Sequence, residues 1–299
     1  MAKILYTNGN GQFMEGDWQI PEPKSDEVLV QSLMTGVCRS DIDMMQGSFP
    51  ALPLHMSGHE GLGRVVAAGP QASDILIGDI VATRGEPAYA DYYIARNREY
   101  VVVPAVHQRY ILEPVACGVN CITQPLEHIK QRAGPDARLL ILGSGFLAWV
   151  VYHTVQHYGL EFSVSVVGGS NRQLWGDRLS DTATGVYDVV VDLSGGDMVF
   201  SKPVVRPEGL VILAAQKTVT TDFSNLLWNA VTIVCPSPRT ERFYDAMVTA
   251  RDMIMHRSLN VDSFWSRGYN RNTEWQQAFA DAVNRPQGYS RGYIYWPDE

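Results

Sequence analysis

The stretch Leu139-Leu-Ile-Leu-Gly-Ser-Gly-Phe-Leu-Ala148 decides the fold of the second half of this chain. Four apolar residues, typical of a buried strand, run into a glycine-rich turn, and an apolar helical pattern follows to about His157. Gly143 allows the tight turn, Gly145 lets a pyrophosphate approach the helix N-terminus, and the small Ala148 permits close packing of helix on strand. In this context the pattern predicts a dinucleotide-binding turn; the alternative is a generic glycine-rich turn.

Buried strands and helices alternate from Arg138 onward. Further apolar strands are expected at Phe162 to Val167, Val186 to Asp192, Leu210 to Leu213 and Val231 to Val234. Such alternation predicts an α/β domain of the Rossmann type, in which helices cover both faces of a doubly wound parallel sheet.

The residues after the second strand, Phe162 to Val167, indicate which dinucleotide the domain binds. An Asp or Glu there would hydrogen-bond the ribose of NAD, but no acid occurs between Phe162 and Gly176. Instead Ser170 can donate a hydrogen bond to a 2′-phosphate and Arg172 can pair with it. These residues predict a preference for NADP(H) over NAD(H). The alternative is that Arg172 is a solvated surface residue and that the preference is weak.

A second pair of motifs lies in the first half of the chain, at Cys38-Arg-Ser-Asp41 and Gly58-His-Glu60. A thiolate, an imidazole and a carboxylate suit zinc, and a site with so few protein ligands keeps a position free for water or substrate. We therefore expect a metal enzyme. The surrounding 115 residues read as short strands punctuated by glycine and proline, a pattern typical of a barrel or sandwich.

Composition and charge narrow the class of protein. The 299 residues are 45% hydrophobic, enough for two domains with real cores, and the net charge of -8 disfavours nucleic acid or anionic membranes as partners. A small-molecule substrate fits better. Four scattered cysteines suit a reducing compartment, and the first residues contain no apolar signal core, so we expect a cytoplasmic protein.

Taken together, these motifs resemble the zinc-dependent medium-chain alcohol and polyol dehydrogenase superfamily. The resemblance covers nearly the whole chain and also includes Gly61-Leu-Gly63, Gly69, Gly78-Asp-Ile-Val81, Ala90-Asp-Tyr92 and Glu113-Pro114. It implies a GroES-like β-barrel catalytic domain at residues 1–118 and 261–299, and a Rossmann cofactor domain at residues 119–260.

The resemblance also implies a set of zinc ligands. Cys38 and His59 would bind the catalytic zinc, and Asp41 would hold the imidazole of His59 from behind. Glu60 would ligate the zinc directly or exchange with water. Glu113 is expected to complete the site; the alternative is Cys117, which otherwise reads as a small buried helix residue.

Carried over in the same way, Ser40 would start a proton relay, and Asp43 stands at the outer end of that relay, where the family usually has a histidine. Arg39 would lie near the cofactor pyrophosphate. Alternatively, Ser40 caps a helix and Arg39 is a solvated surface residue. The implied reaction is hydride transfer between NADP(H) and an alcohol or carbonyl compound, with zinc acting as a Lewis acid on the substrate oxygen.

The chain departs from the family in several ways. Between Gly63 and Glu113 it has no cysteine, so no structural zinc is expected. The stretch from Arg172 to Val186 is short, which implies a reduced helix and strand in the sheet. His55 is expected to be an exposed loop residue. The edge strand Val231 to Val234 would allow a homodimer. Rival interpretations are a zinc-free NADPH-dependent quinone or alkene reductase, and a non-catalytic nucleotide-binding module.

Overall fold

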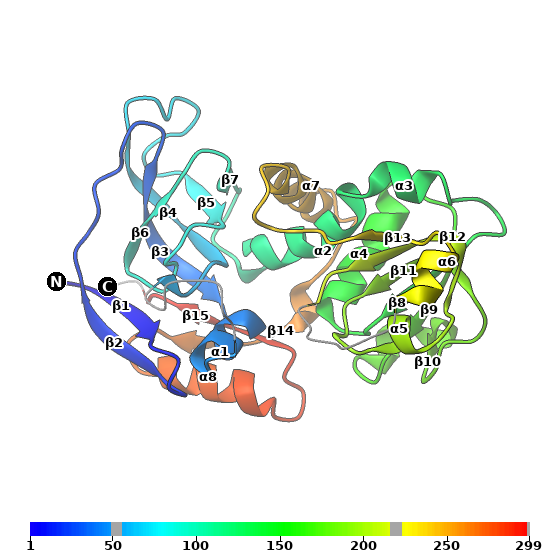
Figure 1. Ribbon diagram of the computed structural model, residues 1–299. Coiled ribbons are helices and arrows are strands. Elements are labelled where there is room, and N and C mark those ends of the chain that lie inside the picture. The colour runs from blue at the N-terminus through cyan, green and yellow to red at the C-terminus, as the bar shows by residue number, and fades with distance from the viewer. Residues whose placement is uncertain (49–55, 216–222, 298–299) are drawn as a thin grey trace. The chain divides into compact units, whose positions relative to one another are not determined.

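The computed structural model describes residues 1–48, 56–215 and 223–297 (Figure 1). The chain forms two compact units, one made of Met1–Pro114 and Ala250–Glu299, the other of Val115–Thr249. The boundaries of the predicted domains, 118/119 and 260/261, stay a prediction.

β-Strands dominate the first unit. Its larger sheet has seven strands, in the order β14-β15-β3-β4-β5-β7 with β6 paired to β3, and a separate antiparallel pair joins β1 to β2. The strands are β1 (Ala2–Thr7), β2 (Phe13–Trp18), β3 (Val28–Gly36), β4 (Gly61–Ala68), β5 (Ile80–Thr83), β6 (Tyr92–Ala95), β7 (Tyr100–Val102), β14 (Trp265–Asn270) and β15 (Arg291–Tyr295). Short strands in the first half of the chain are thereby confirmed.

Strand β3 is central to this sheet because it pairs with β4, β6 and β15. Val28 and Val30 of β3 are fully buried, in one apolar cluster with Val65 of β4 and Val81 of β5. Burying such side chains contributes roughly 1.5–3 kcal/mol each. The strand is thus a rigid support, and its last residue lies two positions before Cys38.

A second apolar cluster of the first unit lies under α1 (Arg39–Met45) and α8 (Trp275–Asn284). The rings of Phe13 and Phe279 stack with their centroids 3.8 Å apart, and the fully buried Tyr89 meets both edge-on. The same unit contains the 3-10 helices η2 (Gln108–Tyr110) and η5 (Asp262–Phe264). Tyr89 is therefore held in this aromatic core by its contacts with Phe13 and Phe279.

Asp91 ties the first strand and the last residues of the chain together. One carboxylate oxygen accepts the backbone N–H of Lys3 at 2.7 Å, and the other accepts the indole N–H of Trp296 at 2.8 Å. The backbone carbonyl of Asp91 accepts the N–H of Ser32 in β3 at 2.9 Å. Residues from both termini thus join the central strand of the first unit.

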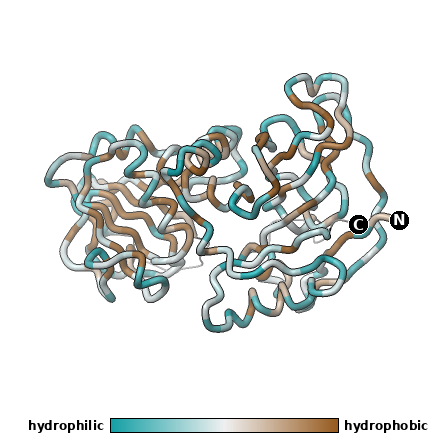
Figure 2. Tube along the Cα trace, turned by 180° about the vertical axis from the view of Figure 1, so that it is seen from behind, coloured by the Kyte–Doolittle hydropathy of each residue, from teal (hydrophilic) through white to brown (hydrophobic). Residues whose placement is uncertain are grey.

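The second unit is built on a parallel sheet of six strands in the order β10-β9-β8-β11-β12-β13. The strands are β8 (Arg138–Leu142), β9 (Ser163–Val167), β10 (Leu179–Ser180), β11 (Tyr187–Asp192), β12 (Val205–Leu213) and β13 (Thr232–Val234). Figure 2 shows the hydrophobic character that runs along these strands. The predicted doubly wound sheet is confirmed, because β8 lies between β9 and β11, so the chain moves to both sides of it.

Helices between Glu113 and Met255 cover two apolar faces of this sheet. One cluster joins Ile122 of α2, Val151 of α4 and Ile141 of β8, and the other joins Val199 of α5 to Val190 and Val211 of the sheet. The helices are α2 (Glu113–Thr123), α3 (Leu126–Lys130), α4 (Phe146–His157), α5 (Met198–Ser201), α6 (Ser224–Trp228) and α7 (Phe243–Met255). Within the described residues, no helix combines the length and apolar character needed to cross a membrane.

The segment between β9 and β11 is reduced, as expected from its length. Only the 3-10 helices η3 (Arg172–Leu174) and η4 (Gly176–Arg178) separate β9 from β10, and β10 has two residues. Trp175 lies between the 3-10 helices with 1% of its surface exposed, and its indole N–H donates to the carbonyl of Ser144 at 3.0 Å. One large side chain thus fills space beside the glycine-rich turn.

Candidate functional site

Two neighbouring strands bring the predicted metal motifs together. Cys38 follows β3 and caps α1, while His59 and Glu60 lead directly into β4. Strands β3 and β4 are antiparallel partners, with Thr35 opposite Gly61, and the N–H of Gly36 donates to the carbonyl of Glu60 at 3.0 Å. The ladder therefore sets Cys38 beside the His-Glu pair.

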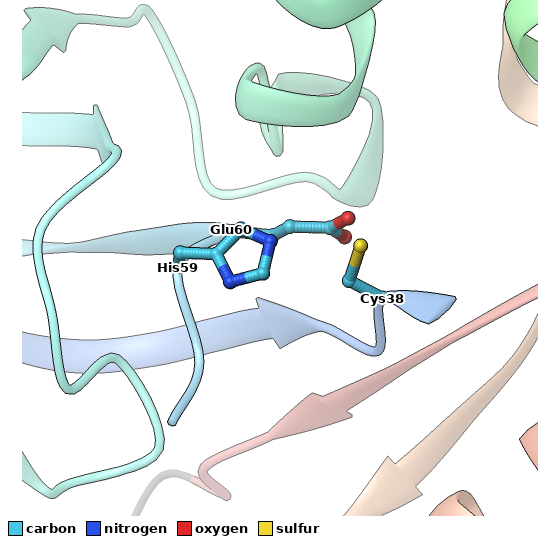
Figure 3. Close-up of side chains that lie close together, drawn as sticks. All are labelled: Cys38, His59 and Glu60. Carbon is cyan, nitrogen blue, oxygen red and sulfur yellow. The ribbon is translucent and has the colours of Figure 1, made fainter. Parts of the chain in front are cut away.

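The donor cluster consists of Cys38, His59 and Glu60 (Figure 3). One ligand atom from each, the sulfur, an imidazole nitrogen and a carboxylate oxygen, lies within 4.8 Å of the others. In the part of the chain that the structure describes, this is the one group of three or more such residues so arranged. A thiolate, imidazole and carboxylate set fits a borderline-soft divalent ion.

Asp41 lies behind the imidazole. Its carboxylate is fully buried, and Oδ1 is 3.6 Å from Nδ1 of His59. The backbone N–H groups of Gly58 and Cys38 each donate to it at 3.2 Å, and the hydroxyl of Tyr89 donates at 2.9 Å. Burial raises the pKa of Asp41 above its ordinary value, although the charge of His59 and the Tyr89 hydrogen bond oppose this. Asp41 thus connects both metal motifs.

The ionisable donors have altered pKa values in the protein alone. Burial, aided by the charge of Glu60, raises the pKa of the Cys38 thiol. Burial lowers the pKa of His59, but the charges of Asp41 and Cys38 raise it by more, so it lies well above its usual range. A cation between them would favour the thiolate and the neutral imidazole instead. Metal binding must therefore displace protons from this cluster.

Arg291 is a member of the site that sequence reasoning missed. Its Nη2 lies 2.5 Å from both carboxylate oxygens of Glu60, which is itself fully buried. Burial lowers the pKa of Arg291, but Glu60 and Cys38 raise it by more, so the guanidinium stays charged. A Cβ at Gly36 would lie 2.0 Å from Glu60 Oε2, so only glycine leaves room for this carboxylate. No spacing signal links residues this far apart along the chain.

Ser40 joins the donor cluster, whereas its two predicted companions on α1 pair with each other. The hydroxyl of Ser40 donates to Cys38 Sγ at 3.2 Å and lies 3.4 Å from His59 Nε2. Nε of Arg39 is 2.9 Å from Oδ1 of Asp43, one helical turn away. The structure therefore places Ser40 beside Cys38 and His59, and Asp43 in an ion pair with Arg39.

Glu113 and Cys117, the two residues considered for the third strong ligand, both belong to α2. Glu113 is buried, with 3% of its surface exposed, and its charge raises the pKa of both His59 and Arg291. Glu113 belongs to the same unit as the donor cluster, and Cys117 to the second unit. Neither is among the donors within 4.8 Å of one another. His55 lies outside the described residues.

The glycine-rich turn stands where the sequence places it, between β8 and α4. Gly143 has φ +116°, and a Cβ at Gly145 would meet only Ser170 Oγ, at 3.8 Å, so the turn leaves space against its backbone. Ala148 is buried against the sheet. The backbone N–H of Ser170 donates to Ser144 Oγ at 2.9 Å, which holds the end of β9 against the turn. This backbone fits a pyrophosphate at the N-terminus of α4.

Arg172 has a partner in the structure. Its Nη1 lies 3.0 Å from Oδ1 of Asp181, and both side chains are largely exposed. β10 pairs with β9 in parallel, with Ser180 opposite Val167, so Asp181 follows β10 at the edge where β9 ends. An acid from the next strand therefore stands close to the predicted phosphate-binding arginine.

Comparisons with known proteins agree with this fold. A family model described as the alcohol dehydrogenase GroES-like domain matches residues 24–115. D-arabitol-phosphate dehydrogenase of Enterococcus avium is 24% identical over 88% of this chain and 88% of its own length. Among solved structures, an Escherichia coli oxidoreductase/dehydrogenase of unknown specificity has a TM-score of 0.80 at 20% identity and covers 100% of both chains.

The structure of acetophenone reductase from Geotrichum candidum, in complex with NAD, has a TM-score of 0.78 at 18% identity and covers 98% of this chain and 97% of that one. Likeness at this level of identity concerns the fold. The matched domain, the curated relatives and the order of the parallel sheet agree with one another. Residues 24–115 belong to the alcohol dehydrogenase GroES-like domain family, and the chain as a whole is similar to oxidoreductases of the medium-chain alcohol and polyol dehydrogenase type.

Proposed function

We propose that this protein is a zinc-dependent oxidoreductase that transfers a hydride between NADP(H) and an alcohol or carbonyl substrate. The observation that carries the proposal is the cluster of Cys38, His59 and Glu60 donors within 4.8 Å, with Asp41 behind the imidazole. A zinc-free reductase would not need this combination of thiolate, imidazole and buried acid.

Each residue of the cluster has a defined role in the proposal. Cys38 and His59 hold one catalytic zinc, Glu113 completes the site, and Glu60 either binds the ion or remains with Arg291. When bound, zinc would polarise the substrate oxygen and the nicotinamide would accept or donate the hydride. No structural zinc is part of the proposal.

We assign the transfer of a proton to Ser40. Its hydroxyl lies within hydrogen-bond distance of the thiol of Cys38 and of His59 Nε2, so it stands beside any oxygen bound at the donor cluster. A hydroxyl there can pass the proton of an alcohol outward. Asp43 would receive the proton at the outer end of the relay. For this, the ion pair between Asp43 and Arg39 has to break. We propose that Arg39 then binds the pyrophosphate of the cofactor.

The cofactor proposal is NADP(H), bound at Gly143, Gly145 and Ala148. Ser170 and Arg172 would contact the 2′-phosphate, since no acid follows β9 before Gly176. NADPH and NADH titrations, followed by tryptophan fluorescence, test this. Arg172→Ala should weaken NADPH binding and leave NADH binding unchanged. Arg178→Ala is the matched control, because Arg178 lies over the Tyr152 ring. Equal or tighter binding of NADH by the wild type would contradict the preference.

The proposed substrates are small alcohols, polyols or the matching carbonyl compounds, in keeping with the polyol phosphate named for the Enterococcus avium relative. We also propose a homodimer through the edge strand β13, whose Ile233 is partly exposed. Neither nucleic acid nor a membrane is a proposed partner, and the proposed location is the cytoplasm.

Metal analysis of the purified protein is the decisive experiment. We expect about one zinc ion per chain, lost in a Cys38→Ala variant together with carbonyl reduction. Cys235→Ala is the matched control because Cys235 is an exposed cysteine, and it should retain both zinc and activity. A metal-free protein active on alkenes or quinones would support the zinc-free reductase. Bound zinc with no turnover on an alcohol and carbonyl panel would support a non-catalytic module.

A further inference from the structure

Tyr89 contacts the metal motifs without being a ligand. Its side chain is fully buried, and its hydroxyl lies 2.9 Å from Oδ2 of Asp41 and 3.2 Å from the carbonyl oxygen of Gly36. The other oxygen of Asp41 faces His59 Nδ1 and the N–H of Gly58. Tyr89 and His59 therefore approach the same carboxylate from its two oxygens.

The ring of Tyr89 is held in place on several sides. Phe13 and Phe279 meet it edge-on at centroid distances of 5.7 and 5.4 Å. A Cβ at Gly58 would lie 2.8 Å from the ring, so the residue before His59 packs directly on it. The N–H of Ala88 donates to the carbonyl of Gly58 at 2.9 Å. With so little room to move, the ring keeps its hydroxyl facing Asp41 and the carbonyl of Gly36, and the shorter contact is the one to Asp41.

The Tyr89 hydroxyl remains protonated and can donate a hydrogen bond to Asp41. Burial, together with the negative charge of Asp41, raises the pKa of Tyr89 well above its usual value, so it keeps its proton at all ordinary pH values. A hydrogen bond to a buried carboxylate is charge-assisted and stronger than a neutral one. Without it, Asp41 Oδ2 would keep only the N–H of Cys38, at 3.2 Å.

We infer that Tyr89 is a positioning residue of the metal site: its hydroxyl fixes the Asp41 carboxylate, which in turn keeps His59 protonated on Nδ1 with Nε2 directed at the ion. This inference rests on the proposed function, because it requires a metal at Cys38 and His59. Partners behind a ligating histidine fix its tautomer and ring orientation, and their loss typically weakens metal binding. A phenylalanine would fill the same space, so the hydroxyl itself carries the effect.

The test compares Tyr89→Phe with Tyr93→Phe. Tyr93 is equally buried in the same unit, and its hydroxyl bonds Thr83 Oγ1 at 2.7 Å instead of Asp41. Zinc affinity is measured by competition with a chromophoric chelator, and the Co²⁺-substituted protein is examined by visible absorption. We expect Tyr89→Phe to bind zinc about tenfold more weakly. Its Co²⁺ ligand-field bands should also shift, whereas Tyr93→Phe should retain the wild-type affinity and spectrum.

Each outcome is decisive. Wild-type affinity and spectrum in Tyr89→Phe, or equal losses in both variants, overturns the role of Tyr89 while leaving the proposed function intact. A wild-type protein that binds neither ion refutes both. Should Tyr89→Phe fail to fold, judged by circular dichroism and melting, imidazole ¹⁵N NMR of the wild-type zinc form still tests the inference. Coordination of His59 through Nδ1 would contradict it.

Discussion

Single residues set the charge balance of the donor cluster. Glu60 is buried next to the thiol of Cys38, and the guanidinium of Arg291 meets both of its carboxylate oxygens. Removing one partner of a buried pair leaves the other charge without compensation, which costs more than the pair itself contributes.

Arg291→Gln should therefore lower the free energy of unfolding of the metal-free protein by about 3–5 kcal/mol. Urea denaturation after chelator treatment measures the loss, which should shrink when zinc is added, because a cation can take over part of the compensation. Lys3→Gln on strand β1 is the control: Lys3 pairs with Asp17 at an exposed position, and its loss should change the free energy of unfolding much less. Equal losses in the two variants would argue against a buried ion pair.

Zinc binding should depend on pH through Cys38 and His59. The pKa of each lies above its ordinary value, so near neutral pH both hold protons that the ion must displace. Apparent zinc affinity should therefore rise with pH, by about tenfold per pH unit for each proton released, and fall on acidification. Chelator competition at several pH values measures it, and calorimetry in buffers of different ionisation enthalpy counts the protons. An affinity that is constant from acidic to alkaline pH would rule out proton displacement.

At the scale of elements, the parallel pairing of β9 with β10 determines which charged side chains lie near Arg172. Carboxyl ends of parallel strands lie at the same edge of a sheet, so the short β10 delivers Asp181 next to Arg172. The pair is exposed, and exposed pairs contribute little to stability. The pair bears on the proposed cofactor: the Asp181 carboxylate would compete for the Arg172 guanidinium with the 2′-phosphate of NADP(H).

Asp181→Asn should strengthen NADPH binding by about two- to fivefold, the range that corresponds to an exposed ion pair, with NADH affinity unchanged. Fluorescence titration of both cofactors at low ionic strength is the measurement. Asp177→Asn, on the same reduced segment in η4, removes an exposed acid of the same charge and should alter neither affinity. If NADPH and NADH respond alike to Asp181→Asn, Arg172 does not contact the 2′-phosphate.

At the scale of the whole molecule, Asp91 joins segments from the two ends of the chain. Its carboxylate accepts one hydrogen bond from Lys3 and one from Trp296. Asp91→Ala would leave a partly buried indole N–H and a strand N–H without these acceptors, and should lower the free energy of unfolding by about 1–3 kcal/mol. Guanidinium denaturation measures the change. Asp26→Ala, at an exposed position, is the control. A comparable loss of stability in Asp26→Ala would contradict a specific stabilising role for the Asp91 hydrogen bonds.

Local patterns in the sequence predicted a large part of this protein. Leu139 to Ala148 was enough for the strand, the turn and the helix, because each depends on residues close together in the chain. Cys38, His59 and Glu60 were predicted as donors from two motifs, and the pairing of β3 with β4 brings them together. Strands β1, β2, β6 and β14 were not predicted, since their polar and apolar residues show no clear alternation.

The sequence by itself determined the apolar strands, the positive backbone angle at Gly143 and the chemical nature of the donors, because these depend on residue type and short-range spacing. Only the tertiary structure decided which charges meet. Arg291 faces Glu60 from 231 residues away, Tyr89 faces Asp41 from 48, and Asp181 faces Arg172 because β10 pairs with β9. Such contacts depend on how strands pair and on which side chains are buried together. Neither can be predicted from the spacing of residues along one sequence.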